Sequence, residues 1–218
     1  MIALVKKKKE IRNPNASFVC SETKANVFLI GDSIRLGYCN TVKEKLSDAA
    51  EVFHFSDNCK STQYAIFSMN NWASMFDDPY MVDIVHFNCG HWDAAHFHGA
   101  ELSLTSLDEY ARNMDVLIKL LKKFFPNATL VFATSTPMNP DTVTFVEPNP
   151  RSDEELDVYN CAAVEIAQKH GVLISDLNAY TRDWGTEAYS DACHFTPTAF
   201  GHLGEEVARR LRKIIDSQ

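Results

Sequence analysis

The stretch VFLIGDSIRLGY, residues 27–38, places Ser33 where an apolar run gives way to the start of a helical pattern. A serine hydroxyl at such a turn can be exposed, and the N–H groups at the helix start can stabilise a developing oxyanion. Serine is a weak nucleophile at neutral pH and needs a neighbouring base. Taken alone, this stretch leaves two interpretations open, since Ser33 could cap the helix or act as a nucleophile.

Asp191 and His194 lie three residues apart in the segment YSDACHFTPTAFGHLG, residues 189–204. A turn at this point can place the carboxylate on one imidazole nitrogen and leave the other nitrogen facing a serine. That arrangement is the base-and-orienter half of a Ser-His-Asp triad. Because most Asp-x-x-His pairs are surface residues, this pair gains its meaning only together with Ser33.

Five short apolar segments and three helical patterns would position these side chains. The apolar segments are nearly continuous and rich in β-branched or aromatic residues, which is typical of parallel strands covered on both faces; they span residues 26–31, 51–55, 82–88, 129–134 and 171–176. The helical patterns span residues 107–125, 154–170 and 198–215, and Ser-x-x-Glu capping boxes precede the first two.

The alternation of strands and helices predicts a doubly wound parallel sheet with helices on both faces. We expect residues 1–25 to form an N-terminal extension and residues 26–218 to form a single domain. Ligands of such sheets bind beyond the carboxyl ends of the strands, where Ser33 and the segment 190–194 meet. The proline-rich loop 137–151 is the longest irregular segment and could border the same site.

Composition and charge narrow the class of protein. The formal net charge of −8 over 218 residues argues against a nucleic-acid partner, and the basic run at residues 6–9 is read as a solvated tail or edge-strand guard. No run is long enough to cross a membrane, and the apolar start MIALV is too short for a secretory signal. The six cysteines are scattered without a C-x-x-C pair, so we expect a cytoplasmic protein with neither a zinc site nor a disulfide framework.

The two motifs in this order resemble the SGNH/GDSL hydrolase family of esterases, lipases, thioesterases and carbohydrate deacetylases. The resemblance covers residues 26–215 and includes STP after the fourth strand, the pair Tyr159-Asn160, and DACHFTPTAFGHLG. It implies a three-layer α/β/α, flavodoxin-like sandwich with a five-stranded parallel sheet. It also implies that Ser33 is the nucleophile, His194 the general base and then acid, and Asp191 the orienter of His194, with no metal or cofactor.

The oxyanion hole departs from the family pattern. Family members have a glycine after the second strand, whereas this chain has SDNCKST, which places Cys59 at that position. After the third strand the family has G-x-N-D, whereas HFNCGHWDAAH offers Asn88 as its amide. The resemblance therefore implies an oxyanion hole formed by the N–H of Ser33, a backbone N–H at Cys59 and the side chain of Asn88. A strand-end turn residue is the alternative role for Asn88.

Five further residues near these motifs are candidates for lining the substrate site: Asp32, Arg35, Gly90, His91 and Trp92. Arg35 could bind an anionic group, although an arginine in the first turn of a helix more often faces solvent.

Five aromatic residues could stack on a sugar or an acyl chain: Trp72, Phe76, Trp92, Phe97 and Phe145. For Trp72 and Phe76 a role in the core is favoured.

Four histidines crowd the segment after the third strand: His86, His91, His96 and His98. Their spacing matches no regular element, so we expect no metal site there and place His86 within the sheet.

The expected function is hydrolysis of a carboxylic ester through an acyl-enzyme on Ser33. Since the sequence shows no lid helix or large apolar insert, a short acyl group such as acetyl, carried by a small molecule or a saccharide, is favoured over a lipid. Two alternatives stay open: a short-chain acyl thioesterase, and a catalytically impaired protein of the same fold that binds a ligand or serves as a scaffold. The sequence gives no oligomeric state.

Overall fold

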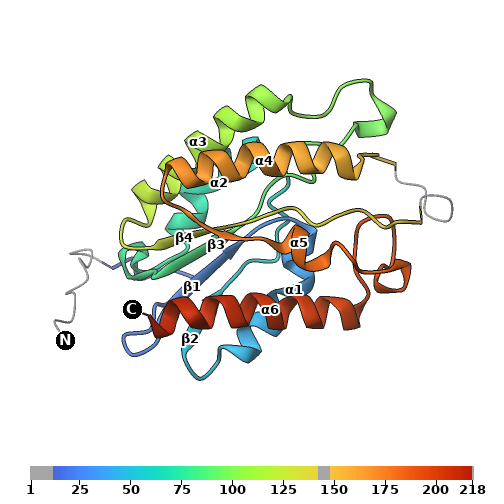
Figure 1. The fold of residues 1–218 in the computed structure, drawn as a ribbon. Helices are drawn as coiled ribbons and strands as arrows, with labels where there is room; N and C mark the ends of the chain where they lie inside the picture. Colours follow the sequence, from blue (N-terminus) through green and yellow to red (C-terminus); the bar gives the residue numbers. More distant parts are fainter. Residues whose placement is uncertain (1–11, 142–147, 218) are drawn as a thin grey trace.

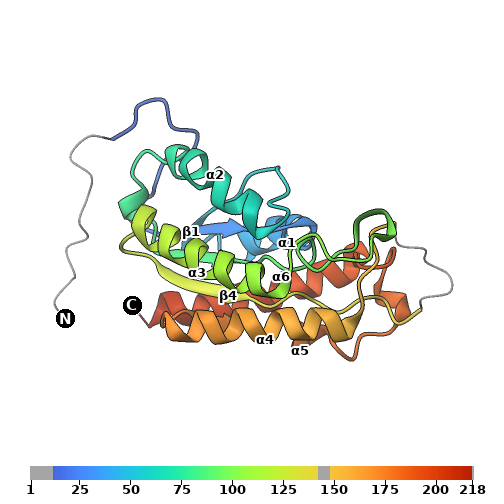
Figure 2. The ribbon, with the colours of Figure 1, turned by 90° about the horizontal axis from the view of Figure 1, so that it is seen from above.

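A computed structural model describes residues 12–141 and 148–217 of the chain. Its centre is a five-stranded parallel sheet in the order β2-β1-β3-β4-β5, enclosed by two layers of helices (Figures 1 and 2). The strands are β1 (Ala25–Ile30), β2 (Ala50–Phe53), β3 (Ile84–Phe87), β4 (Thr129–Ala133) and β5 (Leu173–Ser175). The predicted three-layer α/β/α sandwich is confirmed, and each expected strand is present with its ends displaced by at most two residues.

Six α-helices cover the two faces of the sheet: α1 (Ser33–Lys45), α2 (Thr62–Ser74), α3 (Leu107–Phe124), α4 (Asp153–Lys169), α5 (Leu177–Thr181) and α6 (Pro197–Asp216). Short 3₁₀ turns lie at Pro79–Met81, Phe97–Gly99 and Thr186–Ala188. Two of the helix starts carry the predicted Ser-x-x-Glu sequence. Ser152 and Glu155 form the complete reciprocal capping box, whereas at α3 the Ser106 hydroxyl accepts the Glu109 N–H and itself donates to the Glu109 carboxylate.

The core is divided by the sheet into two clusters. The first lies under α2, α3 and α4 and contains Trp72 and Phe76, as predicted for these two aromatics. The second lies between the sheet and α1, α5 and α6, with α1 packed along α6. His86, which β3 carries, is fully buried without a hydrogen-bond partner, and burial lowers the pKa of its ring to about 3.

Residues 12–25, the described part of the predicted extension, pack against the end of α2. The Phe18 N–H donates to the Met75 carbonyl at 2.8 Å, and the Cys20 N–H donates to the Asp77 carboxylate at 2.8 Å. The basic run at residues 6–9 and Phe145 lie outside the described residues. No helix in the described ranges combines the length and apolarity that crossing a membrane requires.

Candidate active site

Ser33 is the first residue of α1, directly beyond the carboxyl end of β1. The cap of this helix is Asp32, whose Oδ1 accepts the Ile34 N–H at 3.0 Å. The interpretation of Ser33 as the helix cap is therefore wrong. Its side chain is left half-exposed at the positive end of a 13-residue helix.

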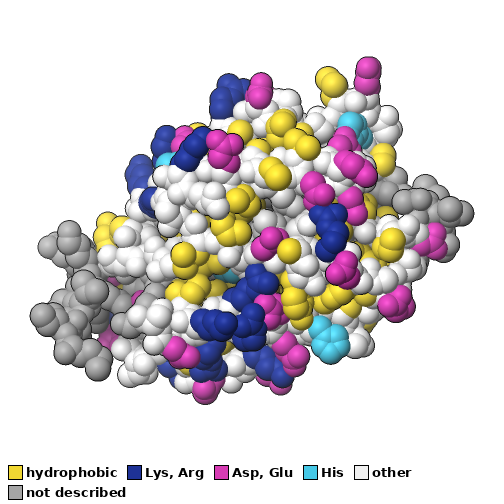
Figure 3. Space-filling model, in the orientation of Figure 1, with side chains coloured by type: hydrophobic (Ala, Val, Ile, Leu, Met, Phe, Trp, Pro, Cys, Tyr) yellow, Lys and Arg dark blue, Asp and Glu magenta, His cyan; other side chains and the backbone are white. Residues whose placement is uncertain are grey.

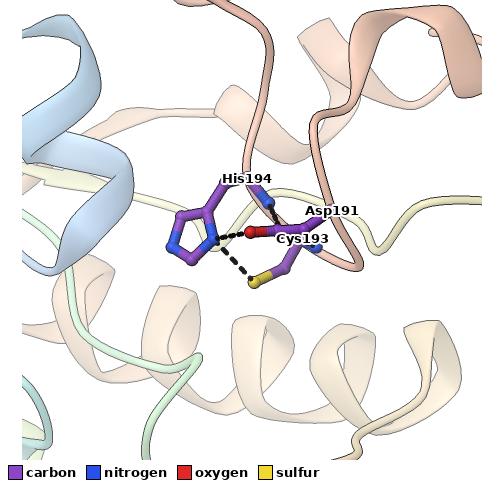
Figure 4. Close-up of side chains that lie close together, drawn as sticks. All are labelled: Asp191, Cys193 and His194. Carbon is purple, nitrogen blue, oxygen red and sulfur yellow. Dashed lines mark hydrogen bonds and ion pairs between the residues drawn. The ribbon is translucent and has the colours of Figure 1, made fainter. Parts of the chain in front are cut away.

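His194 joins Ser33 to Asp191. The Asp191 Oδ2 accepts the Nδ1–H of His194 at 2.7 Å, which leaves Nε2 as the acceptor for the Ser33 hydroxyl, also at 2.7 Å. Figure 4 shows the Asp191 carboxylate beside the ring, with the Cys193 thiol on the same side. Residues 161 positions apart thus form a hydrogen-bonded Ser-His-Asp chain.

The turn from Asp191 to His194 fixes the carboxylate. Its Oδ1 accepts the N–H of Cys193 at 2.9 Å and the N–H of His194 at 2.7 Å. Burial acts to raise the pKa of Asp191, but these two backbone donors and the His194 ring together hold it below its usual value. Asp191 is therefore ionised at neutral pH, as a partner that orients an imidazolium must be.

The loop that follows β4 holds the Asp191–His194 turn through hydrogen bonds. The Asn139 N–H donates to the Ala192 carbonyl at 2.9 Å, and the Asn139 Nδ2 donates to the Asp191 carbonyl at 3.1 Å. Asn160 in turn grips the peptide of Ser135 through hydrogen bonds of 2.8 and 2.9 Å. Asn160 thus anchors the STP segment, and Asn139, just beyond that segment, holds the Asp191–His194 turn through its backbone.

A cavity of about 240 Å³ opens at Ser33 and His194. Its wall includes the two predicted residues His91 and Trp92, and Phe97, which was expected as a possible stacking residue. Six further residues were not predicted to line the site: Ile34, Asn58, Ala95, Asn149, Arg151 and Cys193. Arg151 ends the proline-rich loop that was expected to border a site. The position of that loop was the available signal, and nothing in the sequence singled out the arginine itself.

The structure contradicts the prediction for Cys59. Its N–H donates to the Gly31 carbonyl at 3.1 Å, its Sγ accepts the Gly31 N–H at 3.1 Å, and the residue is fully buried. This backbone donor is therefore occupied and does not face the cavity. The neighbouring Asn58 lines the cavity instead, with its Oδ1 accepting the Lys60 N–H at 2.8 Å.

Lys60 helps to form this loop in the absence of the family's glycine. Its φ of 49° lies in the left-handed region that glycine adopts most easily. The loop therefore keeps a glycine-like backbone turn without the glycine.

Asn88 follows β3 and is buried against Gly31. A Cβ at position 31 would come within 1.8 Å of the Asn88 Oδ1, so only glycine fits there. The amide oxygen, which has no hydrogen-bond partner, faces Gly31. The proposed role of the Asn88 amide in the oxyanion hole stays a prediction.

Three of the five predicted lining residues do not reach the cavity. Arg35 is fully buried, with its guanidinium donating to the carbonyls of Phe55 and Asp57 at 2.7 and 2.6 Å. Asp32 is fully buried as the helix cap, and burial raises the pKa of its carboxyl. Gly90 is enclosed by Ser135, whose Oγ would lie 2.3 Å from an added Cβ. For these residues the position next to a motif was misleading, because the side chains of Arg35 and Asp32 are buried and Gly90 is covered by Ser135.

The histidines after β3 do not converge. His96 pairs with Glu155 at 2.7 Å, whereas the ring of His91 contacts Thr136 and the guanidinium of Arg151. In the described residues, the group whose donor atoms could hold a metal ion is Asp191, Cys193 and His194, and its carboxylate and imidazole belong to the hydrogen-bonded chain with Ser33.

Known proteins with similar sequences are named esterases. A GDSL esterase/lipase of Oryza sativa subsp. japonica is 27% identical over 138 residues, which cover 60% of this chain and 53% of the relative. A GDSL esterase/lipase of Arabidopsis thaliana is 24% identical over 87% of this chain and 86% of the relative. The chain thus spans about half the length of the rice relative. No family model matches the sequence.

Solved structures share the fold. A lipase/acylhydrolase from Enterococcus faecalis superimposes with a TM-score of 0.66 at 17% identity, covering 87% of this chain and 96% of the other. A carbohydrate acetylesterase from Sinorhizobium meliloti superimposes with a TM-score of 0.68 at 13% identity, covering 88% of this chain and 100% of the other. The resemblance to the SGNH/GDSL hydrolases that the motifs indicate is confirmed.

Proposed function

We propose that this chain, which shares sequence and fold features with the SGNH/GDSL hydrolases, is a carboxylic ester hydrolase that works through an acyl-enzyme on Ser33. The observation that carries the proposal is the continuous hydrogen-bonded chain from the Ser33 hydroxyl through His194 to Asp191, opening into a cavity. The esterase names of the sequence relatives support the same reaction class.

In the proposed reaction, Ser33 Oγ attacks the ester carbonyl while His194 Nε2 takes its proton. Asp191 stabilises the imidazolium that forms, and His194 returns the proton to the departing alcohol. A water molecule, activated by the same ring, then releases the acid from Ser33. His194 then returns this second proton, taken from the water, to Ser33 Oγ, which restores the hydroxyl.

The developing oxyanion needs donors on the side of Ser33 away from His194. We propose the N–H of Ser33 and the amide of Asn88 as two of them. Asn58 replaces Cys59 as the third, because its Oδ1 is held by Lys60 and its Nδ2 is left as the donor end of a cavity-lining amide.

A short acyl group is the proposed substrate feature. The cavity of about 240 Å³ is smaller than the roughly 300–1,000 Å³ typical of drug-sized ligands, which suits an acetyl group better than a long chain. A structural neighbour described as an acetyl xylan esterase, with a TM-score of 0.65 at 18% identity, supports acetate on a saccharide as the first ester to test. The cytoplasmic location stays a prediction.

The direct kinetic test compares hydrolysis of p-nitrophenyl acetate by the wild-type protein and Ser33→Ala. We expect a loss of at least roughly a thousandfold in kcat/KM, because the variant keeps only the oxyanion hole and binding contributions. Equal rates in two folded proteins would favour the alternative of a ligand-binding or scaffold protein. Faster turnover of acetyl thioesters than of matched oxygen esters would favour the thioesterase alternative.

A further inference from the structure

Arg151 holds a positive charge in the wall of the cavity that contains Ser33. Its side chain is half-buried, and three of its N–H groups are fixed. Nε donates to His91 Nδ1 at 3.1 Å, Nη1 to the Asn149 carbonyl at 2.9 Å, and Nη2 to the Cys193 Sγ at 3.2 Å. A guanidinium has five N–H groups, so two remain for a ligand.

None of the three acceptors of Arg151 is a carboxylate. Across residues 12–141 and 148–217, no acidic side chain lies within ion-pair distance of its guanidinium, although, against the burial that raises the pKa of the Asp32 carboxyl, Arg151 acts at longer range to lower it. Within the same ranges Arg35 and Arg112 also lack an ion pair, but Arg35 is held by backbone carbonyls outside the cavity and Arg112 is exposed. Burial, followed by the nearby Arg151, lowers the pKa of His91 well below its usual value, so its ring is a neutral acceptor. The half-buried guanidinium therefore has no ion pair, and an anion in the cavity would gain charge-assisted hydrogen bonds from it.

The position of Arg151 relative to the triad is set by Cys193. The Cys193 Sγ lies 3.2 Å from Arg151 Nη2 and 3.7 Å from His194 Nδ1, so a single side chain separates the guanidinium from the base. Because Arg151 and Ser33 also line the same cavity, an anion bound by Arg151 can belong to the same small molecule as the ester that faces Ser33.

The remaining wall suits a polyhydroxylated ring. The rings of Trp92 and Phe97 are half-buried and lie 5.5 Å apart at an interplanar angle of 41°, which offers apolar faces for stacking. The Asn58 Nδ2 carries two N–H groups, so it can donate to a sugar hydroxyl as well as to the oxyanion.

We infer that the ester cleaved at Ser33 is carried by a sugar-like acid, whose carboxylate binds the two remaining N–H groups of Arg151. This inference rests on the proposed function, since it names the substrate class of that same site. Arg151 is a specificity-determining residue that binds the substrate and takes no part in bond making or breaking. Planar, two-point contact with a carboxylate is the recognition for which arginine is best shaped.

The test uses two acetyl esters that differ in a single group: O-acetyl galacturonate methyl glycoside and O-acetyl galactose methyl glycoside. Acetate release is measured for the wild type, Arg151→Gln, Arg151→Lys and the control Arg112→Gln, which removes an equal charge from an exposed position on α3. We expect wild-type kcat/KM to favour the uronate by roughly tenfold to a hundredfold, the worth of a charge-assisted hydrogen-bond pair. The preference should lie in KM, disappear in Arg151→Gln, return in part in Arg151→Lys and persist in Arg112→Gln.

Three results would overturn the inference. They are equal wild-type rates on the two esters, an unchanged preference in Arg151→Gln, and an equal fall in kcat on both esters in that variant, which would make Arg151 a positioning residue. None of these results would contradict ester hydrolysis itself, which the Ser33→Ala comparison tests separately.

A binding measurement keeps the inference testable without turnover. Galacturonate and galactose are titrated into Ser33→Ala, with and without Arg151→Gln, and binding is followed by calorimetry. Binding of galacturonate alone, lost with Arg151→Gln, supports the inference, whereas equal binding of the two sugars overturns it. Inorganic phosphate is titrated as a third ligand. Tighter binding of phosphate than of galacturonate would indicate that the anionic group of the substrate is a phosphate ester and not a carboxylate.

Discussion

At the scale of single residues, the proposed oxyanion hole is where this chain differs most from the SGNH/GDSL pattern. The Cys59 N–H is occupied by the Gly31 carbonyl, so the donor expected at Cys59 must come from another residue, and the neighbouring Asn58 is the one proposed. Asn88, buried at the end of β3 and pressed against Gly31, is the amide that the motif pattern assigns to the hole. The effect of an Asn88 substitution on kcat measures whether this amide stabilises the transition state.

Asn88→Asp keeps the shape of the side chain and removes its N–H donors. We expect kcat to fall by roughly 10²–10³, the usual cost of losing one oxyanion donor, with a smaller change in KM. Steady-state kinetics on p-nitrophenyl acetate provide the measurement, and the thermal midpoint checks folding. An unchanged kcat in a folded variant would remove Asn88 from the hole.

The residues of the proposed triad could be predicted because their signals are local. Ser33 follows a strand in a three-residue motif, and Asp191 and His194 lie within one turn. Arg35 and Cys59 were assigned wrongly, because sequence neighbours of a nucleophile can point to either side of the backbone. Arg151 was missed as a site residue, since its contacts with His91 and Cys193 cross 60 and 42 residues of chain.

At the scale of the elements, Arg35 ties the loop after β2 to the start of α1. Its guanidinium donates to the carbonyls of Gly31, Phe55 and Asp57, and it lies 5.2 Å from the centre of the Phe55 ring. The order of strands and helices was readable from apolar patterning. The contacts of Arg35 could not be predicted from the sequence, because they depend on which loops the fold brings together.

Arg35→Met is expected to lower the free energy of unfolding by about 2–4 kcal/mol. The reason is that several buried carbonyls lose their donor, and each unsatisfied group costs about 1–3 kcal/mol. Urea denaturation followed by circular dichroism measures the change, with the exposed Arg112→Met as the matched control. Equal midpoints for the two variants would show that Arg35 is not a structural clamp.

At the scale of the whole molecule, one group of cations lies along the last helix, α6. Figure 3 shows Lys and Arg side chains gathered over the C-terminal part of α6, among acidic neighbours. Glu206 pairs with Arg209 and Arg210 at 2.7 Å, and Arg212 pairs with Asp48 at 2.5 Å. This group lies at the end of α6 away from the loop that carries His194, so it is an ion-pair network separate from the site.

Glu206 makes this network sensitive to acid. Its hydrogen bonds with Arg209 and then Arg210 lower the pKa of its carboxyl to about 2, below its usual value of 4.5. Between these values the folded state binds fewer protons than the unfolded state, so protonation favours unfolding as the pH falls. The stabilisation is complete above about pH 5 and is lost toward pH 2.

Glu206→Gln should therefore flatten the fall in thermal midpoint between about pH 5 and pH 2, relative to the wild type. Exposure of Arg209 and Arg210 to solvent weakens the effect, so it should shrink further in high salt. The exposed Glu101→Gln serves as the control. Parallel pH curves for the wild type and Glu206→Gln would show that this carboxylate adds nothing to acid stability.

The proposed mechanism requires Ser33 to be an activated nucleophile, and covalent capture tests this directly. The protein is incubated with a fluorophosphonate and analysed by intact mass and peptide mapping. We predict one adduct per chain on Ser33, none on Ser33→Ala, and much slower labelling of His194→Ala, which lacks the base. A folded wild-type protein that stays unlabelled, or carries the adduct on another residue, would contradict the account.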